Sequence, residues 1–227
     1  MNVQFYNIKN RRHLFMELYT VIEKILGPTN WWPANTPFEV CIGAILTQNA
    51  PWSGVEKSIA YLKENRLFDV HIIASAPEYI LAGAIRPSIY HHQKAQRLKV
   101  FCRFLLEHFS GKVENMASLG LLNARKSLLS LPGIGYETAD SILLYALNMP
   151  IFVVDAYTRR IFLRHGLIEH KCDYERLRTF FEEVLEPDAL FYGEFHALLC
   201  LLGAQFCRKK PMCCDCPVLE IAGEAVL

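Results

Sequence analysis

Two glycines with one residue between them separate two apolar runs near the middle of the chain. The segment reads Leu-Pro-Gly-Ile-Gly at 131–135, and apolar runs at 124–131 and 139–147 flank it. Glycine reaches backbone angles that are closed to other residues and lets the backbone approach a ligand closely. The pattern predicts a helix, a tight hairpin and a second helix, whose first N–H groups and positive dipole end suit a phosphate. An ordinary turn between helices is the alternative that Gly-x-Gly alone leaves open.

Apolar residues recur at the spacing of a helix face along the whole chain. Leu14, Leu18 and Ile22 follow this period, and so do Leu177 and Phe181. Gly and Pro lie where such helices should end, and their spacing implies about ten helices of ordinary length. We therefore expect an all-α fold without a solenoid repeat. The 227 residues, 52% of them hydrophobic, can bury one large core or two smaller ones.

Bulk properties constrain the partner and the compartment. The formal net charge of +1 lacks the strongly basic signature of many nucleic-acid-binding proteins. Contact with a duplex would therefore rest on a local basic face and on backbone N–H groups aimed at phosphates. The polar N-terminus, Met1 to Arg12, does not resemble a signal peptide, and no run approaches the ~20 apolar residues that span a bilayer. We expect a soluble cytoplasmic protein with no membrane partner.

One carboxylate ends an apolar stretch just before a basic helix. The apolar stretch is Phe152–Val154, the carboxylate is Asp155, and a basic pair follows at 159–160. As a helix N-cap, Asp155 would accept a hydrogen bond from the N–H of Tyr157 or Thr158. A fixed anion also stabilises the oxocarbenium-like charge that develops on a sugar when its base departs. The two roles are compatible, since a cap fixes where the carboxylate lies.

The hairpin and the carboxylate together resemble the endonuclease III superfamily of DNA glycosylases, which carries a Leu-Pro-Gly-x-Gly hairpin followed by Val-Asp at this distance. The resemblance covers nearly the whole chain. It implies that Asp155 is catalytic and that Gly133, Gly135 and Thr138 of the hairpin contact DNA. Members that also cleave the strand have a lysine two residues after the second glycine, where it forms a Schiff base with the sugar. This chain has Glu137 there, so we predict a monofunctional glycosylase without lyase activity.

All three tryptophans lie between residues 31 and 52, next to Pro33 and a Thr-Gln-Asn at 47–49. This stretch is similar to that of the bacterial 3-methyladenine DNA glycosylases of the same superfamily. The resemblance implies a pocket for a flipped base. An N-alkylated adenine is cationic, and a desolvated cation–π contact with such rings is worth ~1–2 kcal/mol. The expected pocket residues are Trp31, Trp32, Pro33, Trp52 and Glu137.

An ordinary core is the alternative role for the tryptophans, which bury well anywhere. Neighbouring residues cannot both face inward from one helix. We therefore expect that Trp31 or Trp32 lines a cleft.

Further residues are expected to contact DNA. Gln48 follows an apolar helix pattern, and the resemblance implies that its amide fills the gap that the flipped base leaves, since an amide both donates and accepts. A solvated helix end is the alternative. In a loop near the C-terminus, Arg208, Lys209 and Lys210 are expected to contact phosphates.

Four cysteines crowd near the C-terminus, and crowding in a cytoplasmic chain indicates a metal rather than disulfides. Cys207, Cys213 and Cys216 match three ligands of the [4Fe-4S] cluster that many superfamily members hold, but the fourth position is Ala222. Cys200 lies two helical turns before Cys207, ~10 Å away. This is too far for Cys200 to supply the fourth ligand of the same cluster. A zinc site and a loop without metal remain as alternatives.

The resemblance further implies two helical lobes around a DNA-binding cleft. One is a helical barrel lobe at 34–150 with the helix-hairpin-helix near 124–147. The other combines 1–33 with 151–227 and includes the segment 207–216 with the four crowded cysteines, called the cysteine loop below. The expected protein is a bacterial, nucleoid-associated monomer that removes alkylated purines from damaged double-stranded DNA. A glycosylase for mismatched or oxidised pyrimidines and a non-catalytic DNA-binding module are the alternatives.

Overall fold

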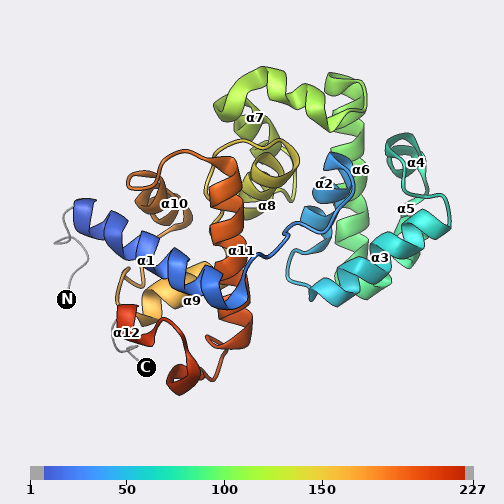
Figure 1. The fold of residues 1–227 in the computed structure, drawn as a ribbon. Coiled ribbons are helices and arrows are strands. Elements are labelled where there is room, and N and C mark those ends of the chain that lie inside the picture. Colours follow the sequence, from blue (N-terminus) through green and yellow to red (C-terminus); the bar gives the residue numbers. More distant parts are fainter. Residues whose placement is uncertain (1–7, 223–227) are drawn as a thin grey trace. The chain divides into compact units, whose positions relative to one another are not determined.

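Helices form all the regular structure in residues 8–222, the part of the chain that the computed structural model describes (Figure 1). The all-α prediction is confirmed for this part. Helices also end where Gly and Pro predict, since α1 (Ile8–Leu26) stops before Gly27 and α9 (Ala156–Arg164) stops just before Gly166. The first seven residues of the polar N-terminal segment lie outside the described residues. No helix in the described part is long and apolar enough to cross a membrane.

The chain divides into two compact units. The continuous unit is formed by residues 32–149, and the discontinuous unit combines residues 1–31 with 150–227. The continuous unit contains α2 (Pro37–Leu46), α3 (Trp52–Glu64), α4 (Val70–Ser75), α5 (Glu78–Ala84), η2 (Arg86–Ser88), α6 (His91–Phe109), η3 (Val113–Leu119), α7 (Gly120–Leu129), α8 (Tyr136–Ser141) and η4 (Ile142–Ala146). The discontinuous unit contains α1, α9, α10 (Tyr174–Glu182), α11 (Ala189–Gln205), η5 (Cys213–Asp215) and α12 (Leu219–Ala222).

Helix α2 lies in the core of the continuous unit. Its residues from Glu39 to Leu46 are all buried, as expected for a helix that is apolar on every side. Thr36 caps its first turn by accepting a hydrogen bond from the N–H of Glu39 at 3.1 Å, and Pro37 occupies the first helical position. The sequence of this segment therefore specifies both where α2 starts and that it is buried. Helices α4, α5 and α2 pack against the long α6.

A buried lysine fixes the end of α2. The ammonium group of Lys94 is completely buried and donates hydrogen bonds to the carbonyl oxygens of Leu46 at 2.7 Å and Ser88 at 2.5 Å. Burial, together with the smaller effect of the nearby charge of Arg97, lowers the pKa of Lys94 to about 8. The last turn of α2 is thus tied to η2, which fixes the backbone that leads to Gln48.

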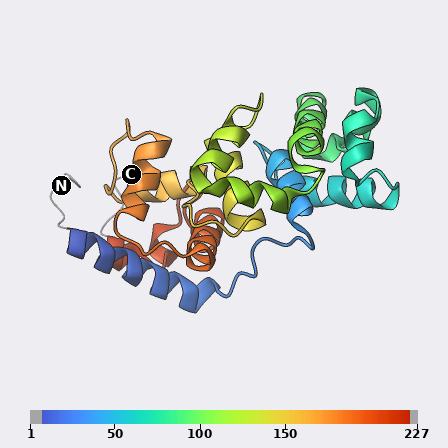
Figure 2. The same ribbon diagram turned by 90° about the horizontal axis from the view of Figure 1, so that it is seen from above.

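Aromatic rings fill the core of the discontinuous unit. The rings of Phe152 and Phe181 stack with centroids 3.9 Å apart, and Phe15 of α1 contacts Phe181 at 4.8 Å and Phe162 at 5.5 Å. Figures 1 and 2 show α1 running beside α11, and the two helices pack together. Phe195 of α11 lies 5.9 Å from Phe181. Aromatic side chains bury large apolar areas, so this cluster binds α1, α9, α10 and α11 into one core. Phe152 therefore anchors in the core the backbone that leads to Asp155.

An ion pair joins the two helices of the predicted hairpin. Arg125 of α7 donates to both carboxylate oxygens of Asp140 in α8, at 2.7 and 3.0 Å. Asp140 is completely buried, and the side chain of Arg125 is 14% exposed. The guanidinium also lies over the ring of Tyr136, 5.2 Å from its centroid. This bidentate pair fixes how α7 and α8 pack against each other.

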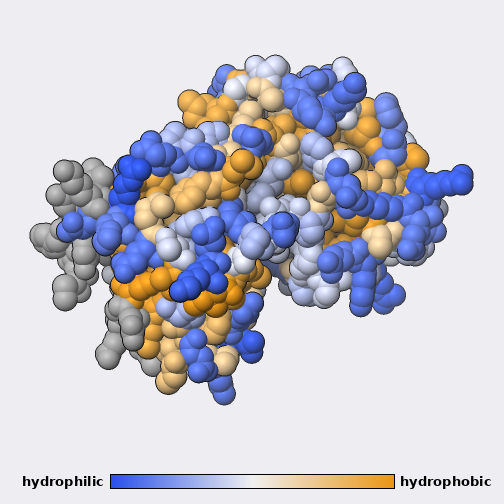
Figure 3. All heavy atoms as spheres, viewed as in Figure 1, coloured by the Kyte–Doolittle hydropathy of each residue, from blue (hydrophilic) through white to orange (hydrophobic). Residues whose placement is uncertain are grey.

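The surface shows no segregation of residue types on the face that Figure 3 presents. Hydrophobic residues are scattered there among hydrophilic ones. Large apolar side chains such as Leu122 and Leu190 are exposed. Scattered exposed apolar residues are normal for globular proteins and indicate no particular partner.

Replacing Asp140 with alanine should lower the free energy of unfolding by about 3–5 kcal/mol, because it leaves a largely buried guanidinium without its bidentate acceptor. Urea denaturation measures the loss. Glu186→Ala is the matched control, since it breaks the exposed ion pair with Arg12, in which the glutamate side chain is 74% exposed, and should cost about 1 kcal/mol at most. Equal losses in the two variants would contradict a structural role for the buried pair.

Candidate active site

Asp155 lies immediately before α9 and caps it. Its backbone is extended, and its Oδ1 accepts a hydrogen bond from the N–H of Thr158 at 2.7 Å. The predicted N-cap is confirmed, with Thr158 rather than Tyr157 as the donor. The preceding residues 151–154 are buried, whereas Asp155 itself is half-exposed. The carboxylate is therefore held in place from both sides and still reaches the surface.

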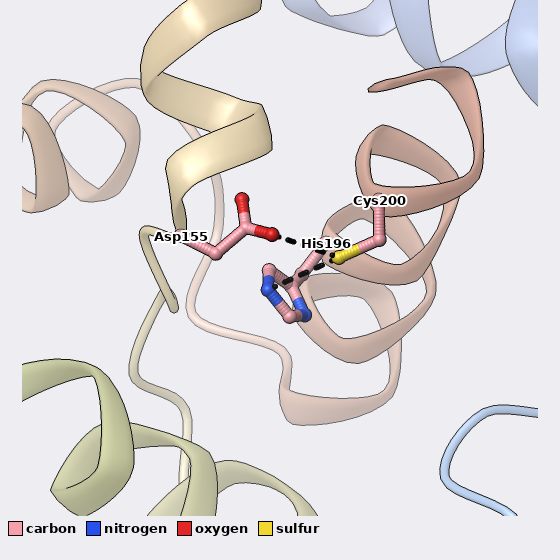
Figure 4. A group of neighbouring side chains, drawn as sticks. All are labelled: Asp155, His196 and Cys200. Atoms are coloured by element: carbon pink, nitrogen blue, oxygen red, sulfur yellow. Dashed lines mark hydrogen bonds between the residues drawn. The ribbon is translucent and has the colours of Figure 1, made fainter. Parts of the chain in front are cut away.

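Cys200 of α11 contacts the other oxygen of this carboxylate, and His196 of the same helix contacts the Cys200 thiol (Figure 4). The thiol of Cys200 donates to Asp155 Oδ2 at 3.3 Å, and the Sγ atom lies 3.5 Å from Nε2 of His196. His196 is buried and Cys200 is half-buried. Burial lowers the pKa of His196, while the nearby charge of Asp155 opposes this shift, so the neutral imidazole is favoured at neutral pH. A carboxylate, an imidazole and a thiol, all of which can bind a metal ion, thus lie close together.

Close packing between α9 and α11 fixes the turn that carries Asp155. A Cβ atom on Gly203 of α11 would lie 2.5 Å from Cδ1 and 2.6 Å from Cβ of Tyr157, in the first turn of α9. Only glycine allows this approach. The guanidinium of Arg160 lies over the Tyr157 ring at 4.9 Å, and its Nη2 donates to the carbonyl oxygen of Gly203 at 3.2 Å. These contacts hold the beginning of α9 directly on α11.

The hairpin in the continuous unit has the predicted form, but its two glycines differ. Gly133 has a φ of +83°, in the left-handed region that favours glycine. Gly135 has an extended backbone that any residue can adopt, and a Cβ atom there would meet nothing within 4 Å. The prediction that both glycines need special backbone angles is therefore wrong for Gly135. Both residues are exposed, so the turn presents its backbone to solvent.

Gln48 and Thr138 bond within the protein at this hairpin. The Nε2 atom of Gln48 donates to the carbonyl oxygen of Gly133 at 3.0 Å and to the hydroxyl of Thr138 at 2.8 Å. Arg97 donates to Oε1 of Gln48. The Thr138 side chain is buried, so any contact of its hydroxyl with DNA is unfavourable in this arrangement. Gln48 would have to release these bonds before its amide could fill a gap in a duplex.

Three aromatic side chains meet in the continuous unit. The ring of Trp32 lies 5.4 Å from that of Trp52, edge to face, and 5.3 Å from that of Tyr145. All three are half-buried. A Cβ atom on Gly43 would lie 3.1 Å from the indole Nε1 of Trp32, so α2 forms the floor under this ring. The predicted residues Trp32 and Trp52 are therefore brought together, with Tyr145 beside them.

The other three predicted pocket residues are Trp31, Pro33 and Glu137. Trp31 is half-buried and belongs to the discontinuous unit, while Pro33 and Glu137 are exposed. Residues 31–36 form an irregular segment, not a helix. The argument that only one tryptophan can face inward from a helix is therefore wrong here, because both indoles are half-buried from a segment without helical geometry.

The cysteine loop encloses a small cavity between α9 and α11. Cys207, Cys213 and Cys216 line it together with His165 and Arg164. Nη1 of Arg164 donates to Sγ of Cys207 at 3.3 Å and to the carbonyl oxygen of Arg208 at 2.6 Å. Burial raises the pKa of the Cys216 thiol in the metal-free protein.

These residues do not fit a four-cysteine cluster. The cavity measures about 10 Å³, which is room for roughly one water molecule and not for a cube of iron and sulfur atoms. Its lining within residues 8–222 includes three thiols and no fourth. The thiol of Cys200 lies instead against Asp155, so it is engaged elsewhere. In the described residues, the group that brings at least three ligand atoms within 4.8 Å of one another is Asp155, His196 and Cys200, not the cysteine loop.

The basic residues of this loop are accessible. Arg208, Lys209 and Lys210 are all exposed. Arg164 also donates to the carbonyl oxygen of Lys209 at 3.1 Å, which ties the loop to the last residue of α9. The structure thus leaves these three cations at the surface, as contact with phosphates requires.

Neither Tyr145 nor His196 is among the residues named from the sequence, where Cys200 is considered only as a cluster ligand and not as a neighbour of Asp155. Tyr145 lies in the π-helix η4, and neither its spacing nor its neighbours indicate contact with Trp32. His196 and Cys200 are four residues apart on α11, a spacing that puts them on one face of a helix. That spacing was a usable signal, but the sequence does not show that the face points at Asp155.

Comparison with known proteins identifies relatives across most of the chain. Residues 42–187 match the family described as HhH-GPD superfamily base excision DNA repair protein. A protein of Methanocaldococcus jannaschii, proposed by its name to be a DNA repair glycosylase, is 43% identical over 93% of this chain and 97% of its own length. Endonuclease III of Thermotoga maritima is 28% identical over 79% of each chain.

A solved structure is similar as well. The crystal structure of a 3-methyladenine DNA glycosylase of H. pylori bound to 1,N6-ethenoadenine superposes with a TM-score of 0.74. The sequences are 31% identical, and the match covers 86% of this chain and 97% of that chain.

Gly203→Ala should lower the free energy of unfolding by about 1–3 kcal/mol, because the added methyl group overlaps the Tyr157 side chain. The double variant Gly203→Ala/Tyr157→Ala removes the overlapping ring and should recover part of the loss. Chemical denaturation of the two single variants and the double variant gives the coupling energy. Strictly additive losses would contradict direct packing of Tyr157 on Gly203.

Proposed function

This chain belongs to the HhH-GPD superfamily of base excision DNA repair proteins, and on that premise we propose that it is a monofunctional DNA glycosylase for alkylated purines such as 3-methyladenine. The observation that carries this proposal is the half-exposed carboxylate of Asp155, fixed at the start of α9 by the N–H of Thr158. A charge fixed before the reaction begins needs no reorganisation when the transition state forms.

The reaction is hydrolysis of the N-glycosidic bond. The bond between the base nitrogen and C1′ breaks, its electron pair leaves with the base, and positive charge develops on the sugar. Asp155 stabilises that charge, a water oxygen attacks C1′ and forms the new C–O bond, and the water releases a proton to the solvent. The products are the released base and an abasic site. A base that is already cationic leaves as a neutral molecule, so it departs easily without strong acid catalysis.

The aromatic side chains Trp32, Trp52 and Tyr145 support a cationic substrate. An alkylated purine is planar and positively charged, so the faces of electron-rich rings attract it more than they attract the neutral base. The similar H. pylori protein is named a 3-methyladenine DNA glycosylase, which favours the same lesion here. A base reaches such rings only after it leaves the duplex stack.

The hairpin supports binding to the DNA backbone. Its turn is exposed, and the first N–H groups of a helix have no acceptors within the helix. Backbone contacts of this kind bind phosphates without reading sequence. We assign Gly133 and Gly135 to this contact through the backbone, and Arg208, Lys209 and Lys210 to further phosphates.

Glu137 supports the absence of lyase activity. It is exposed in the first turn of α8, at the position where the resemblance puts the lysine of strand-cleaving members. A carboxylate cannot form an imine with the sugar. The reaction therefore stops at the abasic site.

An endonuclease III-like glycosylase for mismatched or oxidised pyrimidines is the second candidate. The relationship to endonuclease III of Thermotoga maritima favours it. The two candidates differ in the released base, because a neutral pyrimidine gains less from the faces of the aromatic rings.

Purified protein should release 3-methyladenine from methylated duplex DNA, and Asp155→Asn should slow that release by about 100-fold or more, because it removes the charge that stabilises the transition state. The folded state should change by only about 0.5 kcal/mol, since asparagine caps a helix as well as aspartate does. Chromatography of freed bases from alkylated, mismatched and oxidised duplexes measures both the activity and the lesion.

Asp173→Asn is the matched control. Asp173 caps α10 by accepting from the N–H of Arg176 at 2.8 Å, in the geometry that Asp155 has at α9. This variant should release bases at the wild-type rate. Release of pyrimidines alone would favour the second candidate, and release at an unchanged rate by Asp155→Asn would exclude the proposed chemistry.

Glu137→Lys tests the monofunctional assignment. The wild-type protein should leave damaged strands intact until alkali cleaves the abasic sites, and the variant should gain a borohydride-trapped covalent complex, because its amine can form the imine. Denaturing gels of end-labelled duplex read both results. A trapped complex with the wild-type protein would contradict the assignment.

A further inference from the structure

We propose that Asp155, His196 and Cys200 form a binding site for a thiophilic divalent cation such as Zn²⁺, which switches the active site off while it is bound. The three side chains offer a carboxylate oxygen, an imidazole nitrogen and a thiol sulfur, and these ligand atoms all lie within 4.8 Å of one another (Figure 4). Zn²⁺ binds these three ligand types.

The separations fit tetrahedral zinc. With Zn–S near 2.3 Å and Zn–N and Zn–O near 2.0 Å, the sulfur should lie about 3.5 Å from each of the other two ligand atoms. The structure has 3.3 Å from Cys200 Sγ to Asp155 Oδ2 and 3.5 Å from Sγ to His196 Nε2. The two separations that involve the sulfur therefore already match such a site, and the His196 and Asp155 ligand atoms lie within 4.8 Å of each other.

The elements that carry the three ligands are packed against each other. His196 and Cys200 are one turn apart on α11, and ligands at this spacing point the same way from a helix. Asp155 is fixed by its cap, and α9 packs on α11 through Gly203 and Tyr157. Such a frame holds three ligands and leaves the fourth position to water, as in open zinc sites.

Charge also favours a divalent ion. The carboxylate and a thiolate each carry one negative charge, and a neutral imidazole adds none, so the occupied site is neutral. Binding must release the proton of the Cys200 thiol, which makes affinity depend on pH. Asp155 and Cys200 are half-buried, so an ion can reach them from solvent.

The consequence for activity rests on the proposed function. A cation on Asp155 neutralises the charge that would stabilise the sugar, so catalysis and metal binding compete for one carboxylate. The binding of the metal does not depend on that function and can be measured alone.

Cobalt binding to the purified, reduced, metal-free protein tests the site. Co²⁺ at one equivalent should give the near-ultraviolet absorption of a thiolate–cobalt bond and visible bands of tetrahedral geometry. Cys200→Ser should abolish the thiolate band, whereas Cys214→Ser, which changes an exposed thiol of the cysteine loop, should keep it. Excess Zn²⁺ should displace the cobalt. Circular dichroism confirms that each variant is folded.

The double variant Cys213→Ser/Cys216→Ser separates this site from the cysteine loop. The band should persist in it. Loss of the band there and its survival in Cys200→Ser would place the metal in the loop and overturn the proposal, as would absence of any thiolate band in the wild-type protein. Should Cys200→Ser misfold, His196→Gln gives a second test, with at least a 10-fold weaker affinity for Co²⁺ expected.

Base release with and without Zn²⁺ tests the switch. Zn²⁺ should slow the wild-type protein at least 10-fold, a chelator should restore the rate, and the ratio of the two rates should approach one in Cys200→Ser. Normal base release that Zn²⁺ does not slow would overturn the switch alone. Cobalt binding without base release from any duplex would leave the metal site intact and count against the proposed glycosylase.

Discussion

The hydrogen bond from the N–H of Thr158 to Asp155 fixes the one carboxylate on which the proposed chemistry depends. A flexible aspartate would lose part of its electrostatic effect in reorganisation. Here the residue is anchored by a buried apolar stretch before it and by a helix turn after it. This first turn of α9 packs directly on α11 through the contact between Tyr157 and Gly203. The position of one charge thus depends on close packing between two helices.

The continuous unit uses buried polar groups for the same purpose. Lys94 ties the end of α2 to η2, Gln48 ties the following segment to the hairpin, and Arg125 ties the hairpin helices to each other through Asp140. Each bond satisfies groups that would be costly if left unpaired away from water. Together they hold the exposed turn of the hairpin against the core.

The Asp155 carboxylate has two neighbours that the proposed hydrolysis does not require. Cys200 and His196 could have been replaced by apolar residues if packing were their only role, because volume-conserving apolar substitutions cost little in a core. Their polar atoms instead lie at the carboxylate. A group that must stay charged for catalysis is also a good metal ligand, so the same local chemistry serves activity and its inhibition.

The sequence by itself determined the features that depend on local backbone physics. It indicated the helices and their ends, the hairpin at Gly133, the cap at Asp155 and the aromatic content of the segment from Trp31 to Trp52. Only the tertiary structure decided which side chains meet: that Tyr145 joins Trp32, that Gln48 faces the hairpin, and that Cys200 reaches Asp155 and not the cysteine loop. Periodicity shows which face of a helix is buried, but it does not show which other helix that face will touch.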